Sequence, residues 1–377
     1  MGMSNAPWSD LLHSVSEDRL RHTIETLSSW NTRNTNTPEA REVAQWIATE
    51  FESVPGIEVE IWEYEIQEGR RVPQTKKVPQ VIATLPGRSE RRVMVGGHFD
   101  TLNADFAGDL FSLRAPGAND DGSGTAVALE MAKVLGGQKW ENTLVFCAFS
   151  GEEQGLLGSR ALAKRAADEG WKIDALLSND MVGNSSTRRG AHDDETLRVF
   201  SEEAPQRHQS RELARWIEWI TRGQIPGSKV RPVFRKDRFA RGGDHTPFNE
   251  AGFTAVRFVE QMEEYSRQHT VEDLPNAIDY AYLAKNAKVN LIALASLASA
   301  AAPPTEVKVD LGQSYDTTLH WNGLENVDYL VYWRETTSAT WQGCIPVGPQ
   351  DSAKLDLSKD DHVFAVGVHG GIPVIAE

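Results

Sequence analysis

Two neighbouring glutamates, Glu152 and Glu153, come directly after an apolar run in the sequence. The run, TLVFCAFSG at residues 143–151, is typical of a buried strand, so both carboxylates stand near the end of a strand. Acidic residues are favoured at the start of a helix, where the backbone carries partial positive charge. Taken alone, the pair is therefore compatible with a helix start or with a site that needs negative charge.

Further potential metal ligands follow other apolar segments of the chain. They are His98 and Asp100 in VGGHFDT, Asp120 and Asp121 in PGANDDGSG, Asp180 in SNDMVGN, and His269 in RQHTVED. Each has an ordinary interpretation by itself, because a His-x-Asp is usually a surface pair and Asn-Asp-Asp-Gly is a good turn. Their joint occurrence at strand ends would need several independent coincidences, which favours one common site.

The types of these residues indicate the chemistry. Two histidines and several carboxylates, with no thiolate, suit zinc or another divalent first-row ion. Carboxylates crowded in one pocket raise each other's pKa unless cations offset their charge. In hydrolases with paired metals the ions stand about 3.5–4 Å apart, so that one carboxylate can bridge both. The residues therefore predict a hydrolytic centre with two cations.

The segments around these residues alternate between strand and helix patterns. Strands are expected at 57–66, 80–87, 91–100, 142–150, 174–183 and 253–259, and helices at 16–30, 37–54, 122–137, 153–170, 211–223 and 277–300. In the second helix, Thr37 is expected to cap the N-terminus, with Pro38 at the first helical position. The alternation predicts a mostly parallel mixed sheet with helices on both faces, a three-layer α/β/α fold. Ligands of such sheets gather beyond the carboxyl ends of the strands.

The composition changes after Pro303 and Pro304, where short alternating segments follow closely on one another. This pattern predicts a small antiparallel β-sandwich. We therefore expect two domains, a catalytic domain at residues 1–301 and a sandwich at residues 302–377. Trp321 and the run YLVYWR resemble a fibronectin type III module.

Composition limits the classes of partner. The net charge of -15 and the pI near 5.2 argue against a nucleic-acid surface, which needs a basic footprint. No apolar run approaches the roughly 20 residues that span a bilayer. The start MGMSNAPWSDLLHSVSEDRL lacks the basic beginning and apolar middle of a secretory signal. Cys147 and Cys344 are expected to be unpaired core residues.

Residues 10–300 resemble the bacterial di-zinc aminopeptidases, which are related to glutamate carboxypeptidase II, the transferrin receptor ectodomain and glutaminyl cyclase. The resemblance is carried by the motifs VGGHFDT, GANDDGSG, SGEEQG and SNDM and by the late histidine. It implies two Zn²⁺ per chain. The metal ligands that it implies are His98, Asp120, Glu153, Asp180 and His269, with Asp120 as the bridge.

The resemblance also implies roles for residues beside the metals. Glu152 would be the general base that takes a proton from the bridging water and returns it to the leaving amine. Asp100 would orient His98 from behind, without itself binding a metal. A cis peptide bond is implied between Asp120 and Asp121.

The activity implied is removal of N-terminal residues from peptides with a free N-terminus, by a protein that is secreted or periplasmic. A cytoplasmic location stays open. Alternatives are a carboxypeptidase-like or glutaminyl-cyclase-like member of the same fold, and a non-catalytic receptor-like binding protein, which retention of all five ligands disfavours. The sandwich is expected either to act as a spacer or to contact a surface or polymer.

The sequence differs in several features from the families that it resembles. Di-zinc carboxypeptidases and deacylases insert a lid domain before the last histidine, and the segment between Asp180 and His269 is too short for one. Gln268 replaces the tyrosine that in many relatives helps to hold the oxyanion, a role that Tyr265 could take. In ARGGDHTPF, Gly243 replaces a serine, and Asp244 and His245 are expected to be a supporting pair. Loops 184–192 and 231–243 set the depth of the substrate pocket.

Overall fold

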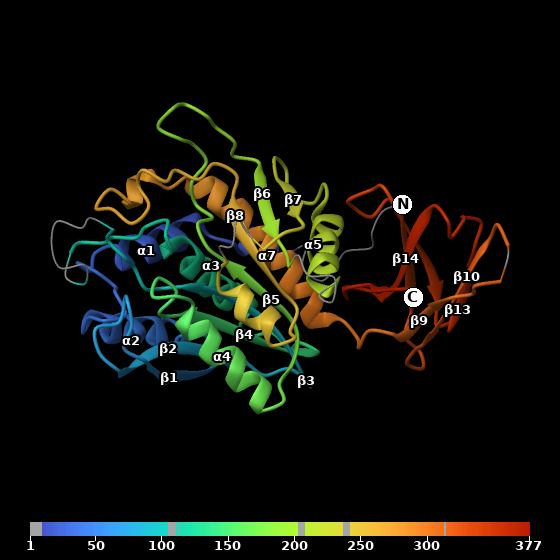
Figure 1. Cartoon of the computed structure of the whole chain (residues 1–377), viewed down its shortest axis with the longest axis horizontal. Coiled ribbons are helices and arrows are strands. Elements are labelled where there is room, and N and C mark those ends of the chain that lie inside the picture. Colours follow the sequence, from blue (N-terminus) through green and yellow to red (C-terminus); the bar gives the residue numbers. More distant parts are fainter. Residues whose placement is uncertain (1–9, 105–110, 112, 203–207, 237–241, 313) are drawn as a thin grey trace.

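A mixed sheet of eight strands forms the centre of the larger part of the molecule, in the order β1-β2-β4-β3-β5-β8-β6-β7 (Figure 1). The computed structural model describes all residues except 1–9, 105–110, 112, 203–207, 237–241 and 313. The strands are β1 (Glu58–Ile66), β2 (Lys76–Leu85), β3 (Ser89–His98), β4 (Asn142–Phe149), β5 (Lys172–Asn179), β6 (Thr196–Phe200), β7 (Lys229–Val233) and β8 (Ala255–Glu260). The core strands β4, β3, β5 and β8 run parallel, which confirms the predicted sheet.

Helices cover both faces of this sheet. One face carries α1 (Glu17–Leu27), α2 (Glu39–Glu52), α3 (Gly122–Leu135), α5 (His208–Thr221) and α7 (Tyr280–Ser299). The other carries α4 (Leu157–Asp168) and the short α6 (His245–Glu250). Two short 3₁₀ segments lie at Asp10–Ser14 and Pro275–Ala277. Separate hydrophobic clusters fill the two interfaces, so the three-layer α/β/α prediction is confirmed.

A close approach of β3 to α3 brings the first two motifs together. A Cβ at Gly97 would lie 2.4 Å from the backbone carbonyl carbon of Gly124, so only glycine fits at this contact. Asp121 caps α3 by accepting from the Gly124 amide, and it also accepts from the amide of His98. The end of β3 and the start of α3 are thereby fixed against each other.

Some element boundaries differ from the sequence prediction. Pro38, not Thr37, occupies the N-cap position of α2, because the Thr37 hydroxyl donates to the carbonyl of Asn34 instead. Helix α4 begins at Leu157 rather than at 153, because Leu156 has a φ of 61° and turns the chain just before the helix. Strand β6 and the edge strand β7 were not predicted. They use part of the chain between Asp180 and His269, where the described residues contain no lid domain.

The C-terminal segment forms two antiparallel sheets at one end of the molecule, next to α5 (Figure 1). One sheet contains β9 (Thr305–Val309), β10 (Thr317–Asn322) and β13 (Ser352–Leu355). The other contains β11 (Tyr329–Glu335), β12 (Gly343–Gly348), β14 (His362–Val368) and β15 (Val374–Ile375). Apolar residues of both sheets share one core. Cys147 and Cys344 are both free thiols. Among the described residues, no helix has the length and hydropathy to cross a bilayer.

Candidate metal centre

The predicted site residues meet at the carboxyl ends of the parallel strands. His98 ends β3, Glu152 and Glu153 follow β4, and Asp180 follows β5. Asp120 lies in the loop before α3, and its peptide bond to Asp121 is cis. His269 comes from the long loop between β8 and α7.

Two groups of side chains are each compact enough to hold one ion. His98, Glu152 and Asp180 form the first group, and Asp120, Glu153 and His269 form the second, with ligand atoms within 4.8 Å of one another in each. Asp120 also reaches the first group. Its Oδ1 lies 3.3 Å from Nε2 of His98, and its Oδ2 lies 3.1 Å from Nε2 of His269.

The neighbouring glutamates face different histidines. Oε2 of Glu152 lies 3.9 Å from Nε2 of His98, and Oε1 of Glu153 lies 2.9 Å from Nε2 of His269. The carboxylate of Asp100 accepts from both of their backbone amides, at 3.2 and 3.1 Å. This acid therefore fixes the turn that directs the two side chains apart.

Asp100 contacts His98 more closely through its main chain than through its side chain. Nδ1 of His98 is 3.1 Å from the backbone carbonyl oxygen of Asp100 and 3.6 Å from its carboxylate. The carbonyl contact is the shorter one, and it directs Nε2 of His98 toward Asp120.

Three further residues support the site and were not predicted from the sequence. Asp273 is buried and accepts from the backbone amides of Asn119 and Asp120, both at 2.9 Å. Arg257 on β8 forms a buried ion pair with Oδ2 of Asp180 at 2.8 Å. Arg33 is fully buried and donates to backbone carbonyls that include those of Phe99 and Gly117. Single arginines and aspartates in loops carry no spacing pattern that could have singled them out.

The structure also describes the residues that were expected to support the site or to hold the oxyanion. Asp244 and His245 are buried at the start of α6, and burial raises the pKa of Asp244 to about 7 and lowers that of His245 to about 3. The side chain of Gln268 donates to Oδ2 of Asp120 at 2.6 Å. Tyr265 is 48% exposed. Part of loop 231–243 lies outside the described residues.

The electrostatics of the site favour bound cations. Burial, and then the charge of Asp180, raise the pKa of Glu152 well above its ordinary value, and burial likewise raises that of Glu153. Nε2 of His98 and Oε1 of Glu153 are buried without a hydrogen-bond partner in the described part of the chain. Imidazole and carboxylate ligands of this kind fit zinc. The site thus has the composition of a zinc centre, and two of its buried ligand atoms have no hydrogen-bond partner in the described residues.

Comparison with known proteins identifies the family of this chain. The profile of Peptidase family M28 matches residues 80–294. A probable zinc metalloprotease of Leptosphaeria maculans is 32% identical over 399 residues, covering 94% of this chain and 92% of that protein. Two solved structures share the fold. The LapA aminopeptidase of Legionella pneumophila has a TM-score of 0.59 at 20% identity, over 75% of this chain and 72% of that chain. A glutaminyl cyclase of Fimbriiglobus ruber has a TM-score of 0.59 at 19% identity, over 77% and 96%. The chain therefore belongs to Peptidase family M28, and its relatives include zinc metalloproteases.

Proposed function

We propose that this protein is an aminopeptidase that holds two zinc ions and removes N-terminal residues from peptides. The observation that supports it is the position of Asp120, whose two oxygens face two separate histidines. His98 and Asp180 would hold one ion, Glu153 and His269 the other, and Asp120 would be shared. When bound, zinc polarises the scissile carbonyl and makes water a stronger nucleophile at neutral pH.

Glu152 is the proposed general base. It belongs to the same cluster as the proposed ligands, yet its side chain is 16% exposed, so water and substrate can reach it. In this mechanism Glu152 takes the proton of the attacking water and donates it to the leaving amine. Gln268 holds Asp120 in place through its amide and is the nearest counterpart of the tyrosine found in many relatives.

Replacement of Glu152 by glutamine tests this assignment. E152Q keeps the size of the side chain but removes the base, so kcat should fall by about 10²–10⁴-fold while zinc content stays unchanged. Hydrolysis of aminoacyl p-nitroanilides and metal analysis on the same preparation measure both quantities. E141Q, at a surface ion pair with Arg88, is the matched control. Full turnover in E152Q would refute the role of base.

Substrates with blocked and free termini separate the related activities. An aminopeptidase cleaves peptides with a free amino terminus and not their N-acetylated forms. A carboxypeptidase instead cleaves peptides with a free carboxyl terminus and not their C-terminal amides. Ammonia release from peptides that begin with glutamine would indicate cyclisation. A zinc-loaded preparation without any of these activities would favour a receptor-like protein.

We also propose that residues 1–301 form the peptidase domain and residues 302–377 a fibronectin type III-like domain. The separate core of β9–β15 and the pairing of a three-stranded with a four-stranded antiparallel sheet support this division.

A further inference from the structure

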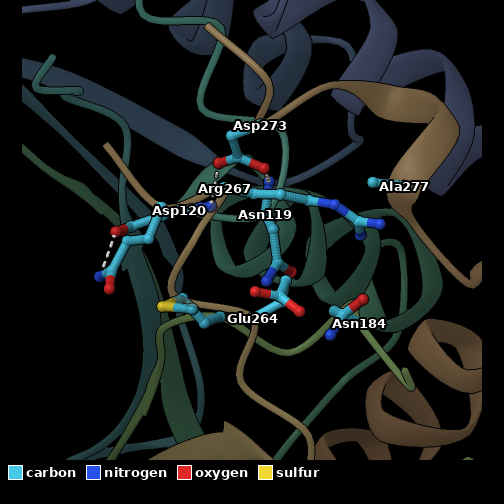
Figure 2. A pocket seen from close by; sticks show the side chains of 9 residues that line it. Asn119, Asp120, Asn184, Glu264, Arg267, Asp273 and Ala277 are labelled. Atoms are coloured by element: carbon cyan, nitrogen blue, oxygen red, sulfur yellow. Dashed lines mark hydrogen bonds between the residues drawn. The ribbon is translucent and has the colours of Figure 1, made fainter. Parts of the chain in front are cut away.

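Asn119, the residue before the proposed shared ligand Asp120, is held at its backbone and at its side chain. Its backbone amide donates to Oδ1 of Asp273 at 2.9 Å, beside the bond from the Asp120 amide to Oδ2 (Figure 2). Its carbonyl accepts from the Ser123 hydroxyl at 2.8 Å. Its side-chain oxygen accepts from the backbone amide of Gly183 at 3.0 Å. The position of Asp120 therefore depends on the contacts of its neighbour.

The side-chain nitrogen of Asn119 donates to a buried carboxylate, that of Glu260 at the end of β8. Nδ2 of Asn119 lies 2.9 Å from Oε1 and 3.1 Å from Oε2 of Glu260. Oε2 also accepts from the backbone amide of Asn184 at 2.7 Å, in the segment that follows β5. Glu260 is fully buried. One carboxylate thus joins the segment that carries Asp120 to the segment after β5.

The main chain of Glu260 is fixed as well. Its amide donates at 2.8 Å to the carbonyl of Met181, the residue after the proposed ligand Asp180. Its carbonyl accepts from Nε and Nη2 of Arg198 at 3.0 and 2.6 Å. Glu260 belongs to neither group of potential metal ligands that the described residues form. It is therefore placed to act on the metal centre through its neighbours and not as a ligand.

The partners of the Asn119 side chain define the orientation of its amide. A carboxylate only accepts hydrogen bonds and a backbone N–H only donates, so Nδ2 must face Glu260 and Oδ1 must face Gly183. Burial raises the pKa of Glu260 well above its ordinary value, while the bonds from Asn184 and Asn119 act in the other direction. The ionised form accepts at both oxygens without turning a proton of its own toward these donors.

A second buried glutamate shows what such a group does away from the metal centre. Glu130 on α3 is 2% exposed and accepts from the amide of Ser16 at 2.7 Å. It also accepts from Nε and Nη2 of Arg19 at 2.8 and 2.7 Å. Neither partner is next to a proposed ligand in the chain. Glu130 thus matches Glu260 in type, burial and hydrogen bonding but has no connection to the site.

We propose that Glu260 is a positioning residue for the shared ligand Asp120 and that it acts through Asn119. The inference rests on the proposed function, because it takes Asp120 to be the carboxylate between two zinc ions. Glu260 touches neither substrate nor metal in this account. It holds the amide of Asn119, and a turn of that amide would shift Asp120 relative to both histidines at once.

Replacement of Glu260 by glutamine tests the effect on zinc. In either orientation of the new amide, an N–H₂ group faces Nδ2 of Asn119, because Nδ2 contacts both oxygens in the unchanged protein. Partners behind metal ligands typically account for about 10–100-fold in metal affinity. Affinity should fall by such a factor for both ions in E260Q, since both share Asp120. Competition with a fluorescent chelator measures the two dissociation constants. E130Q, the matched control, should lower stability and leave zinc affinity unchanged.

A double variant tests the route through Asn119. N119A removes the side chain that Glu260 holds, so its zinc affinity should also fall about 10–100-fold. Two residues that act through one contact do not have additive effects. E260Q/N119A should therefore bind zinc within about twofold of N119A alone. Additive losses would show that Glu260 does not act through Asn119 and would overturn the proposal.

Zinc rescue separates positioning from folding. Excess zinc should restore kcat of E260Q to within about threefold of the unchanged protein, because Glu260 takes no part in the chemistry. If E260Q does not fold, N119A decides, and unchanged zinc affinity in N119A overturns the proposal. Two zinc ions in the unchanged protein with unchanged affinity in E260Q would overturn this inference and leave the proposed function intact. Fewer than two ions in the unchanged protein would contradict both.

Discussion

Asp180 uses its two oxygens for different contacts. Oδ1 lies 3.8 Å from Nε2 of His98, whereas Oδ2 pairs with Arg257. Arg257 has room for this contact because residue 243 is glycine, where a Cβ would lie 2.8 Å from Cδ of Arg257. The replacement of serine by Gly243 and the ion pair of Arg257 are therefore parts of one arrangement that leaves one oxygen of Asp180 for a metal.

Removal of Arg257 should affect the zinc-free protein most. R257M leaves the buried carboxylate of Asp180 without its cation, and breaking a buried pair in this way costs about 3–5 kcal/mol of the free energy of unfolding. Bound zinc supplies charge to the same carboxylate, so the zinc-loaded variant should lose clearly less. Urea unfolding with and without zinc measures the difference.

The control for this prediction is R160M. Arg160 pairs with Glu250 at the surface, and such pairs contribute about 0–1 kcal/mol. Equal destabilisation of R257M in the zinc-free and zinc-loaded forms would contradict the proposed role of Asp180 as a ligand.

The clustering of the histidines and carboxylates was predictable from the sequence because these residue types are rare at strand ends and occur in a recognisable order. The supporting residues were not. Arg33 binds backbone carbonyls and Asp273 binds backbone amides, so their partners have no side-chain identity that a sequence could show. Arg257 depends on a neighbouring strand, β8, that only the folded sheet brings next to Asp180.

Among the elements, the loop between β8 and α7 contributes several residues in or beside the candidate metal centre. It supplies His269 and Gln268 to the metal centre. Asp273 ties this loop to the start of α3 through the amides of Asn119 and Asp120. The loop and the helix therefore position the two residues, His269 and Asp120, that face each other across the second group.

Replacement of Asp273 should loosen this connection. D273N keeps one acceptor but turns an amide N–H₂ toward one of the two backbone donors, so one charge-assisted hydrogen bond is lost. Partners behind metal ligands typically account for about 10–100-fold in metal affinity, and zinc affinity should fall by such a factor. Competition with a chromophoric chelator measures it. Unchanged affinity in D273N would show that Asp120 is held without this contact.

The predicted elements that match the structure have strong periodic patterns, such as the wholly buried β4 and the long α7. The elements and boundaries that the sequence prediction missed have local causes. The start of α4 was obscured by a turn at Leu156. The hydroxyl of Thr37 donates to the carbonyl of Asn34 and does not accept from an amide of the helix. Strands β6 and β7 are short and partly exposed, so their hydrophobic pattern is weak.

Across the whole molecule, α5 connects the peptidase sheet with the C-terminal sheets. Trp219 of α5 packs edge-on against Tyr332 of β11, and Arg215 and Arg222 donate to the carbonyls of Ala339 and Trp341. Because of these contacts, we expect the two proposed domains to unfold together.

Truncation of Trp219 should allow the two proposed domains to unfold separately. W219A removes a partly buried indole from this interface, at a cost of up to about 3 kcal/mol, the lower end of the range for buried tryptophans. Calorimetry should then show two transitions in place of one. W46A, in a helix distant from β11, should lower stability without splitting the transition. A single transition in W219A would show that the interface does not couple the domains.

The proposed chemistry depends on two ions held by one shared carboxylate. Crystallographic anomalous scattering at the zinc edge, on protein with its metal content determined, tests this arrangement. We predict two peaks about 3.5–4 Å apart, one beside His98 and Asp180 and one beside Glu153 and His269, with Asp120 between them. A single peak, or two peaks that do not share Asp120, would contradict it.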